Sequence, residues 1–313
     1  MKSLKIGITG AGGMIGRYLA KNWIDENLIL YSSQSAKLEH QHFLRSLDPK
    51  QDQITPFIQS SDVIIHLAHN TSPLASNRLF PESFGENISF TQRLVFGLMQ
   101  QKRSKPPLVV YLSSGGTVYG DVIPVLGGIT ETYPTLPISP YGLEKLSCEH
   151  LLRLGAMRGH YKLVVLRASN IYGSPLAKEG SQGIIGVGLT RIKGGLPLII
   201  TMNPQTMRDY LHLENLSTAI SQVIGAQLSG EFYCFNIGTG QGHSIQNIIA
   251  QFRKTTKADI KIEMRIHDFV QYAPHWNILN SDKIKGLIGW QPKISLEDGI
   301  DSLWSALFQS SSK

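Results

Sequence analysis

The stretch Thr9-Gly10-Ala11-Gly12-Gly13-Met14-Ile15-Gly16 decides the fold, because it joins an apolar run at 4–9 to a helical pattern that continues from Arg17. Gly10 permits a tight turn, Gly13 lets the main chain approach a pyrophosphate, and Gly16 lets the helix pack closely on the strand. The helix N-terminus attracts phosphate through its unpaired N–H groups. The stretch therefore predicts a dinucleotide-binding turn that includes Met14 and Ile15; a tight turn without a ligand is the alternative.

Further apolar runs typical of strands follow along the chain, with helical patterns between most of them. Together with the first, these runs lie at 4–9, 27–31, 62–68, 107–113, 162–169 and 231–237. Strands that alternate with helices predict a parallel sheet covered by helices on both faces. The third and fourth runs lack alternation of apolar and polar residues, which favours central strands. The expected fold class is α/β, with a doubly wound parallel sheet.

The character of the sequence changes after Gly173, and this change predicts a second, smaller unit. A small and polar stretch follows there, and the sheet pattern returns only near residue 208. We expect a dinucleotide-binding domain made of 1–173 plus 208–242. A smaller C-terminal α/β substrate domain is expected from 174–207 plus 243–313.

Composition excludes several classes of protein. The chain has 313 residues, of which 42% are hydrophobic and 17% charged, so it can build a core and is neither disordered nor a coiled coil. Its net charge of +7 is scattered, which indicates anionic small molecules as partners and no nucleic acid. The two cysteines lack metal or disulfide spacing, so no metal is expected and a reducing compartment fits. Without an apolar signal core or membrane span, we expect a cytoplasmic protein.

Tyr141 and Lys145 lie four residues apart in a helical pattern and therefore share one helix face. An ammonium group beside a phenol favours the phenolate, which suits a general base. This spacing alone often arises by chance. Its weight comes from Ser113–Gly120, which follows an apolar strand at the carboxyl end, where ligands bind in open α/β sheets.

The end of the second strand bears on the choice of cofactor. A dinucleotide site normally has an acid there that bonds the ribose hydroxyls. The segment 28–37 has no acid and offers Ser32, Ser33 and Lys37 instead. The segment is thus compatible with the 2′-phosphate of NADP, and also with the free ribose of NAD hydrogen-bonded by hydroxyl side chains. We expect NAD, with NADP as the alternative.

These motifs, in this order, resemble the extended short-chain dehydrogenase/reductase family, of the NAD-dependent epimerase/dehydratase type, and within it enzymes such as UDP-glucose (UDP-galactose) 4-epimerase. The resemblance covers nearly the whole chain. It rests on the glycine turn, 62–68, Asn87, Ser113–Gly120, Tyr141 with Lys145, 167–173, 208–212, 235–240 and 289–292. It implies a Rossmann-type dinucleotide-binding domain.

Carried over by position, the resemblance implies that Tyr141 is the catalytic base and that Lys145 binds the nicotinamide ribose. Besides the glycine turn, the cofactor would be lined by Leu67, Ala68, His69, Asn87 and Ser113. The nucleotide-sugar site would be formed by Asn170 at the diphosphate, Arg208 and Arg265 at the nucleotide, and Asp268, with Tyr272 and Asn277 as alternative pocket residues. For Arg208, a surface ion pair with Asp209 is the competing interpretation.

The chain departs from the family pattern at Gly115, where the family usually has the Ser or Thr whose hydroxyl bonds the reacting substrate oxygen. Thr117 is expected to supply this hydroxyl, with Ser114 second. Dehydratases of the family have an Asp-Glu pair where this chain has Gly116-Thr117, so 4,6-dehydration lacks its acid/base pair and is set aside.

The resemblance implies a nucleotide-sugar 4-epimerase, with a UDP-hexose as the favoured substrate. Tyr141 would take the C4 hydroxyl proton while a hydride passes to the nicotinamide and returns to the other face of the sugar. The alternative is an NADP-dependent reductase of a nucleotide-linked keto-sugar. A non-catalytic dinucleotide-sensing protein comes third, because a fold does not guarantee an activity.

A homodimer is expected through the helix after Asn87 and the helix that carries Tyr141, as is common in the family. Both helices are rich in apolar residues: Leu94, Val95, Leu98 and Met99 on the first, and Leu143, Leu146, Leu151 and Leu152 on the second. The alternative is that these residues face the monomer core. Glu144, Glu149 and Arg153 predict that part of the second helix faces solvent.

Overall fold

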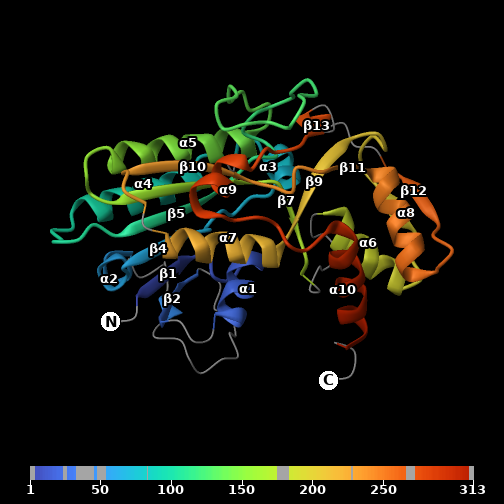
Figure 1. Cartoon of the computed structure of the whole chain (residues 1–313), viewed down its shortest axis with the longest axis horizontal. Helices are drawn as coiled ribbons and strands as arrows, with labels where there is room; N and C mark the ends of the chain where they lie inside the picture. Colours follow the sequence, from blue (N-terminus) through green and yellow to red (C-terminus); the bar gives the residue numbers. More distant parts are fainter. Residues whose placement is uncertain are drawn as a thin grey trace. The chain divides into compact units, whose positions relative to one another are not determined.

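The helices and strands in Figure 1 come from a computed structural model of the chain. Three predicted site residues, Ser33, Lys37 and Asp268, lie outside the described residues. The structure describes residues 4–23, 27–32, 46–47, 54–82, 84–174, 183–226, 228–265 and 272–309.

A seven-stranded sheet contains all six apolar runs predicted as strands, and the two-residue strand β3 is added at one edge. Neighbouring strands follow the order β10-β6-β5-β4-β1-β2-β3, and the pairs β1·β2, β1·β4, β2·β3 and β4·β5 are parallel. The expected doubly wound α/β fold is confirmed. The strands are β1 Lys5–Thr9, β2 Asn27–Tyr31, β3 Ser46–Leu47, β4 Val63–His66, β5 Leu108–Ser114, β6 Lys162–Ala168 and β10 Phe232–Ile237.

The strand order reverses at β1, because β2 pairs with one of its edges and β4 with the other. Such a switch point opens a crevice at the carboxyl ends of the strands, where ligands bind in this fold class. Thr9 ends β1 and His66 ends β4, directly opposite each other. The glycine-rich turn follows Thr9 and so begins at this crevice.

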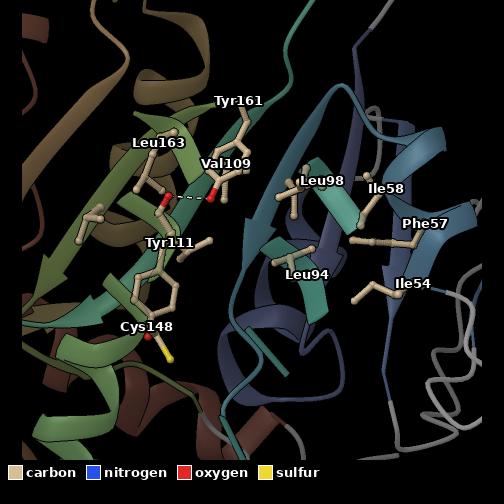
Figure 2. Close-up of a cluster of buried hydrophobic side chains, with 14 of the residues drawn as sticks. Ile54, Phe57, Ile58, Leu94, Leu98, Val109, Tyr111, Cys148, Tyr161 and Leu163 are labelled. Carbon is tan, nitrogen blue, oxygen red and sulfur yellow. Dashed lines mark hydrogen bonds between the residues drawn. The ribbon is translucent and has the colours of Figure 1, made fainter. Parts of the chain in front are cut away.

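Helices α2, α4 and α5 cover one face of the sheet, and Figure 2 shows the packing. Phe57, Leu94 and Leu98 are almost fully buried there, against alternate strand residues such as Val109. Each such side chain stabilises the fold by about 1.5–3 kcal/mol. The helices that accompany the sheet are α1 Met14–Asn22, α2 Ile54–Ser60, α3 Pro73–Arg78, α4 Glu86–Met99, α5 Pro140–Ala156 and α7 Leu213–Gly225.

The monomer core uses part of the surface predicted to form a subunit interface. Leu94, Leu98 and Leu152 are at most 1% exposed and belong to the cluster under α4 and α5. Leu146 is 9% exposed. For these four residues the prediction of a subunit surface is wrong, because all four are buried in the monomer, and Leu94, Leu98 and Leu152 pack in the core against the sheet.

The chain divides into two compact units. The first comprises Met1–Ser113, Leu143–Arg167 and Ile220–Phe235, and the second comprises Ser114–Gly142, Ala168–Ala219 and Asn236–Lys313. The first unit contains the glycine turn, α4 and most of α5. The domain boundaries drawn from the sequence stay a prediction.

The second unit has its own core between α6, α8 and α10, with Leu189, Phe252 and Ile300 fully buried. Its sheets are β11-β9-β13, with β7 also on β9, and β12-β8. Its elements are β7 Asn170–Tyr172, α6 Ile184–Lys193, β8 Leu198–Ile200, β9 Met207–His212, β11 Gly242–Ser244, α8 Ile245–Thr256, β12 Ile262–Met264, β13 Trp276–Asn277, α9 Asp282–Ile288 and α10 Leu296–Gln309. Among the described helices, none has both the length and the apolar character to cross a membrane.

Candidate active site

The glycine-rich stretch forms a tight turn with no room for side chains at two positions. Gly10 has φ +69°, and a Cβ there would lie 2.7 Å from the Ala68 nitrogen. A Cβ at Gly16 would lie 2.6 Å from Ala11 Cα. Gly13 is exposed and precedes α1, and no side chain of the described residues caps the helix, so the first N–H groups of α1 are open to an anion. This cradle fits the pyrophosphate of a dinucleotide.

The chain that follows β4 lies against this turn. The N–H of Leu67 donates to the carbonyl of Thr9 (3.2 Å), and the N–H of Ala68 donates to the Thr9 hydroxyl (3.2 Å). Two of the residues predicted to line the cofactor, Leu67 and Ala68, are therefore adjacent to Gly10. Ser32 directly follows β2, which pairs with the other edge of β1.

His66 is a core histidine with a partner at each ring nitrogen. Its Nδ1 lies 2.8 Å from the Thr9 hydroxyl and its Nε2 lies 3.1 Å from the Thr91 hydroxyl. Burial, helped by the charge of Lys145, lowers the pKa of His66 to about 3. The imidazole is therefore neutral at ordinary pH and ties β1 and β4 to α4.

Helix α5 carries Tyr141 and Lys145 one turn apart. Lys145 is 4% exposed, its Nζ donates to the Leu112 carbonyl (2.9 Å), and it lies 5.2 Å from the centre of the Tyr111 ring. Burial lowers the pKa of Lys145 to about 8, against the opposing effect of Cys148, Glu149 and Glu144. Tyr141 is partly exposed. The two residues therefore lie one turn apart on a single helix, with Lys145 buried and Tyr141 partly exposed.

Glu144 and Glu149 are buried, contrary to the expectation that they face solvent; their exposures are 1% and 6%. The Glu149 carboxylate accepts hydrogen bonds from the Ser113 hydroxyl and from Nε (3.1 Å) and Nη2 (2.7 Å) of Arg167. The side chain of Ser113, predicted to line the cofactor, is thus directed to a carboxylate that joins α5 to β5 and β6.

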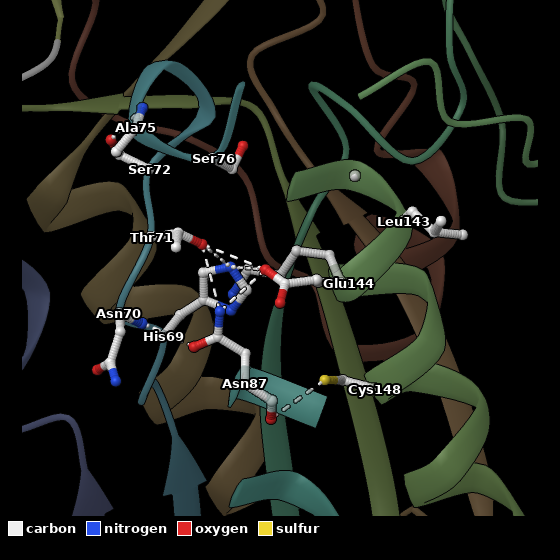
Figure 3. Close-up of polar contacts among 12 residues, drawn as sticks. His69, Asn70, Thr71, Ser72, Ala75, Ser76, Asn87, Leu143, Glu144 and Cys148 are labelled. Carbon is white, nitrogen blue, oxygen red and sulfur yellow. Dashed lines mark hydrogen bonds and ion pairs between the residues drawn. The ribbon is translucent and has the colours of Figure 1, made fainter. Parts of the chain in front are cut away.

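Figure 3 shows the polar cluster around Glu144. The carboxylate accepts hydrogen bonds from the Gly85 N–H (2.9 Å), Asn87 Nδ2 (2.9 Å) and the Thr71 hydroxyl (3.2 Å). Sequence analysis missed this role, although a glutamate three residues after Tyr141 on an apolar helix was a signal. Asn87, predicted to line the cofactor, lies inside the cluster.

His69 contributes to the same cluster. Its Nε2 lies 3.2 Å from the Thr71 hydroxyl and 3.7 Å from the Glu144 carboxylate. Burial, followed by the charges of Lys145 and His66, lowers the pKa of His69 far below its usual range. This histidine is therefore neutral and acts as a polar contact, not as one half of an ion pair.

In the second unit, Ser114 and Thr117 stand beside Gly115, both partly exposed. The Thr117 hydroxyl donates to the Ser114 carbonyl at 3.5 Å, a long bond that leaves it able to turn to another acceptor. The Gly115 carbonyl accepts from Asn277 Nδ2 (2.8 Å). Asn277 is fully buried, and among the described residues its Oδ1 has no hydrogen-bond donor.

Arg208 does not form the surface ion pair that was its competing interpretation. It is 6% exposed, and within the described part of the chain its guanidinium donates to the carbonyls of Met207 and Pro274. The Asp209 carboxylate instead accepts from the N–H (3.0 Å) and hydroxyl (2.7 Å) of Thr239. Burial lowers the pKa of Arg208 to about 10, so it is a buried cation at neutral pH.

The remaining predicted substrate residues differ in their surroundings. Asn170 donates to the Asp209 carbonyl (3.1 Å), and its Oδ1 would lie 3.8 Å from a Cβ at Gly116. Arg265 is an exposed residue of the segment after β12 and pairs with Glu263 at 2.6 Å. Tyr272 is 44% exposed. Asn170 is thus close to Gly116, whereas Arg265 faces solvent.

Comparisons of the chain with a family model, with curated proteins and with solved structures agree on one family. A model of the "NAD dependent epimerase/dehydratase family" matches residues 6–238. A dTDP-4-dehydro-6-deoxyglucose reductase of Escherichia coli is 27% identical over 95% of both chains. A UDP-glucose 4-epimerase of Halalkalibacterium halodurans is 25% identical over 95% of this chain and 94% of its own. The crystal structure of UDP-glucose 4-epimerase with UDP-glucose from Thermotoga maritima is 25% identical and covers 99% of this chain and 100% of its own, with a TM-score of 0.86.

Proposed function

Because the chain belongs to the NAD-dependent epimerase/dehydratase family, we propose that it is a nucleotide-sugar 4-epimerase that acts on a UDP-hexose with bound NAD. One observation carries the proposal most strongly: α5 presents a partly exposed Tyr141 one turn from the buried ammonium of Lys145. The open glycine cradle at the start of α1 supports the dinucleotide.

Each step of the proposed reaction assigns a task to a side chain of this chain. Bound NAD supplies a hydride acceptor that can return the hydride. Tyr141 takes the proton from the C4 hydroxyl and gives it back, acting as general base and then acid. Lys145 keeps the phenolate favourable through its charge and bonds the nicotinamide ribose. Thr117, with Ser114 second, bonds the reacting oxygen in place of the hydroxyl that Gly115 lacks.

The substrate's anionic end is assigned to Arg208. A planar guanidinium matches phosphate oxygens, and a buried arginine that donates to neutral carbonyls has charge to offer a diphosphate. Asn170 is assigned to the diphosphate as well, and Arg265, Asp268, Tyr272 and Asn277 to the nucleotide and sugar. Ser32, Ser33 and Lys37 complete the proposed cofactor site.

The test uses the purified protein without added cofactor. After denaturation, the mass and ultraviolet spectrum of any released dinucleotide are recorded; NAD is the expected result. Native protein is then incubated with UDP-glucose or UDP-galactose. An epimerase interconverts the two with no net change in nicotinamide absorbance. A protein that releases nothing and converts neither sugar contradicts the proposal.

A second candidate is an NADP-dependent reductase of a nucleotide-linked keto-sugar. Two observations favour it: the E. coli relative has that type of activity in its name, and segment 28–37 has no acid. Stoichiometric consumption of NADPH by a keto-sugar nucleotide would establish it.

We also propose a cytoplasmic site of action, because Cys148 and Cys234 are buried thiols that suit a reducing compartment.

A further inference from the structure

We infer that Glu144 is a positioning residue for the catalytic helix: it holds the loop His69–Thr71 and the start of α4 against α5 and keeps a negative charge beside Lys145. The inference rests on the proposed function, because that function makes Lys145 and the loop part of the cofactor site. Glu144 directly precedes Lys145 and takes no part in the reaction itself.

The Glu144 carboxylate joins two other segments to α5: the start of α4 and the loop after β4. Its donors are the Gly85 N–H just before α4, the Asn87 amide in the first turn of α4, and the Thr71 hydroxyl of the loop after β4. Figure 3 shows the side chains of Thr71 and Asn87 directed at the carboxylate. A carboxylate this deeply buried is tolerated only when such donors are present. The N-terminus of the 14-residue α4 adds a favourable dipole.

The same cluster orders the loop that the sequence predicts to line the cofactor. Asn87 Oδ1 accepts the Asn70 N–H (2.7 Å), and Asn87 Nδ2 also donates to the Thr71 hydroxyl (3.2 Å). Because the single hydroxyl proton of Thr71 goes to Glu144, the contact with His69 Nε2 requires that His69 donates. Glu144 thus determines the direction of the hydrogen bond between Thr71 and His69.

Glu144 and Glu149 differ in whether a neighbouring positive group compensates their charge. Glu149 is paired with Arg167, so its charge is compensated. Within the described residues, the hydrogen-bond donors of Glu144 are all neutral, and His69 is neutral as well. Glu144 is therefore the uncompensated carboxylate on α5 next to Lys145, where it favours the ammonium form.

The other groups that face Lys145 do not replace this charge. Glu149 has a larger effect than Glu144 on the Lys145 pKa, but its charge is already paired with Arg167. From β5, Lys145 meets the Leu112 carbonyl and the Tyr111 ring. From β4 and the loop after it come the neutral His66 and His69. On α5 itself, Cys148 has its pKa raised by burial and is a thiol at neutral pH. Loss of the Glu144 charge should consequently make Lys145 lose its proton at lower pH.

The experiment compares Glu144→Gln with Glu86→Gln, which removes an equal charge from an exposed position in the first turn of α4. We expect Glu144→Gln to bind NAD about tenfold more weakly and to move the alkaline limb of the turnover profile down by roughly one pH unit. Hydrogen exchange at the Asn70 amide should accelerate about tenfold or more, because its acceptor Asn87 is no longer held. Glu86→Gln should match the wild type in all three.

A second variant, Thr71→Val, separates the hydrogen bonds from the charge. It should accelerate exchange at Asn70 but leave the alkaline limb in place. A Glu144→Gln protein that keeps either the wild-type alkaline limb or wild-type exchange at Asn70 overturns the inference. Hydrogen exchange at Asn70 is measured without ligand or turnover. A wild-type protein with no epimerase activity would therefore contradict the proposed function, while the exchange rates would still test the role of Glu144.

Discussion

At the scale of single residues, Tyr141 is the position where loss of one oxygen should matter most. Tyr141→Phe is expected to keep the cofactor and to lose turnover by roughly two to four orders of magnitude, the typical contribution of a positioned acid/base group. Interconversion of UDP-glucose and UDP-galactose measures the rate, and the mass of the released dinucleotide measures retention.

Tyr233→Phe is the matched control for this variant. Its hydroxyl accepts the N–H of Gly230 three residues away, so its loss should leave turnover unchanged. If Tyr141→Phe kept more than about a tenth of the wild-type rate, a role as general base would be excluded.

The buried charge of Lys145 makes a prediction about stability and pH. Its folded pKa of about 8 is below the ordinary 10.5, so between these values the unfolded chain binds more protons. Stability from this group is therefore lowest below pH 8 and rises as the pH rises toward 10.5. Relative to Lys145→Met, the wild type should gain about 3 kcal/mol across that window. Urea unfolding of both proteins at pH 7 and pH 10 measures it; a constant difference would contradict the buried ammonium.

At the scale of elements, the Glu149–Arg167 pair joins α5 to β6. Glu149→Gln should destabilise folding by about 3–5 kcal/mol, because it leaves the Arg167 guanidinium buried without its counter-charge. The exposed pair of Lys254 and Glu297 is the control, since Glu297→Gln removes the same charge from a pair open to solvent and should change little. Denaturant unfolding compares them, and equal effects would refute the distinction.

Two glycines of the turn are expected to serve different purposes: Gly16 is needed for folding and Gly13 for binding the cofactor. Gly16→Ala should unfold or strongly destabilise the first unit, because its Cβ would meet main-chain atoms at 2.6 Å. Gly13→Ala should fold, since among the described residues its Cβ would meet only the Gly10 carbonyl at 3.3 Å, yet it should lose NAD where the backbone approaches the pyrophosphate. Thermal unfolding and cofactor retention measure the two effects. Normal retention in Gly13→Ala would contradict the cradle.

Strands and the glycine turn were predictable because their signals are local. Each of the six apolar runs forms a strand where the sequence predicts one, whereas β3 has only two residues and therefore no pattern to detect. Glu144 and Glu149 were misjudged because their partners are distant in sequence: Gly85 lies 59 residues before Glu144, and Arg167 follows Glu149 by 18. A charged residue on a helix ordinarily faces solvent unless tertiary contacts supply donors, and periodicity does not reveal those donors.

At the scale of the whole molecule, we propose a homodimer through α4 and α5, on a different set of residues from the one predicted from the sequence, with only Leu143 in common. Apolar side chains that the sheet leaves exposed are Phe96 (64%) on α4, Leu143 (45%) and Leu154 (52%) on α5, and Met157 (66%) directly after α5. Solvent-exposed apolar groups on adjacent helices are typical of a subunit interface. In a dimer with two-fold symmetry, each of these side chains occurs once in each subunit, so one substitution changes the interface at two places.

Light scattering at micromolar concentration tests this assembly, and the wild type should have twice the chain mass of 34.6 kDa. Phe96→Asp combined with Leu154→Asp should give monomers, because a desolvated carboxylate at each contact opposes association. Leu126→Asp, at a fully exposed position in the second unit, is the control and should stay dimeric. Since α5 carries both Tyr141 and Lys145, the monomeric variant should also turn over more slowly. A wild type that is fully active at 34.6 kDa would exclude both the interface and its effect on catalysis.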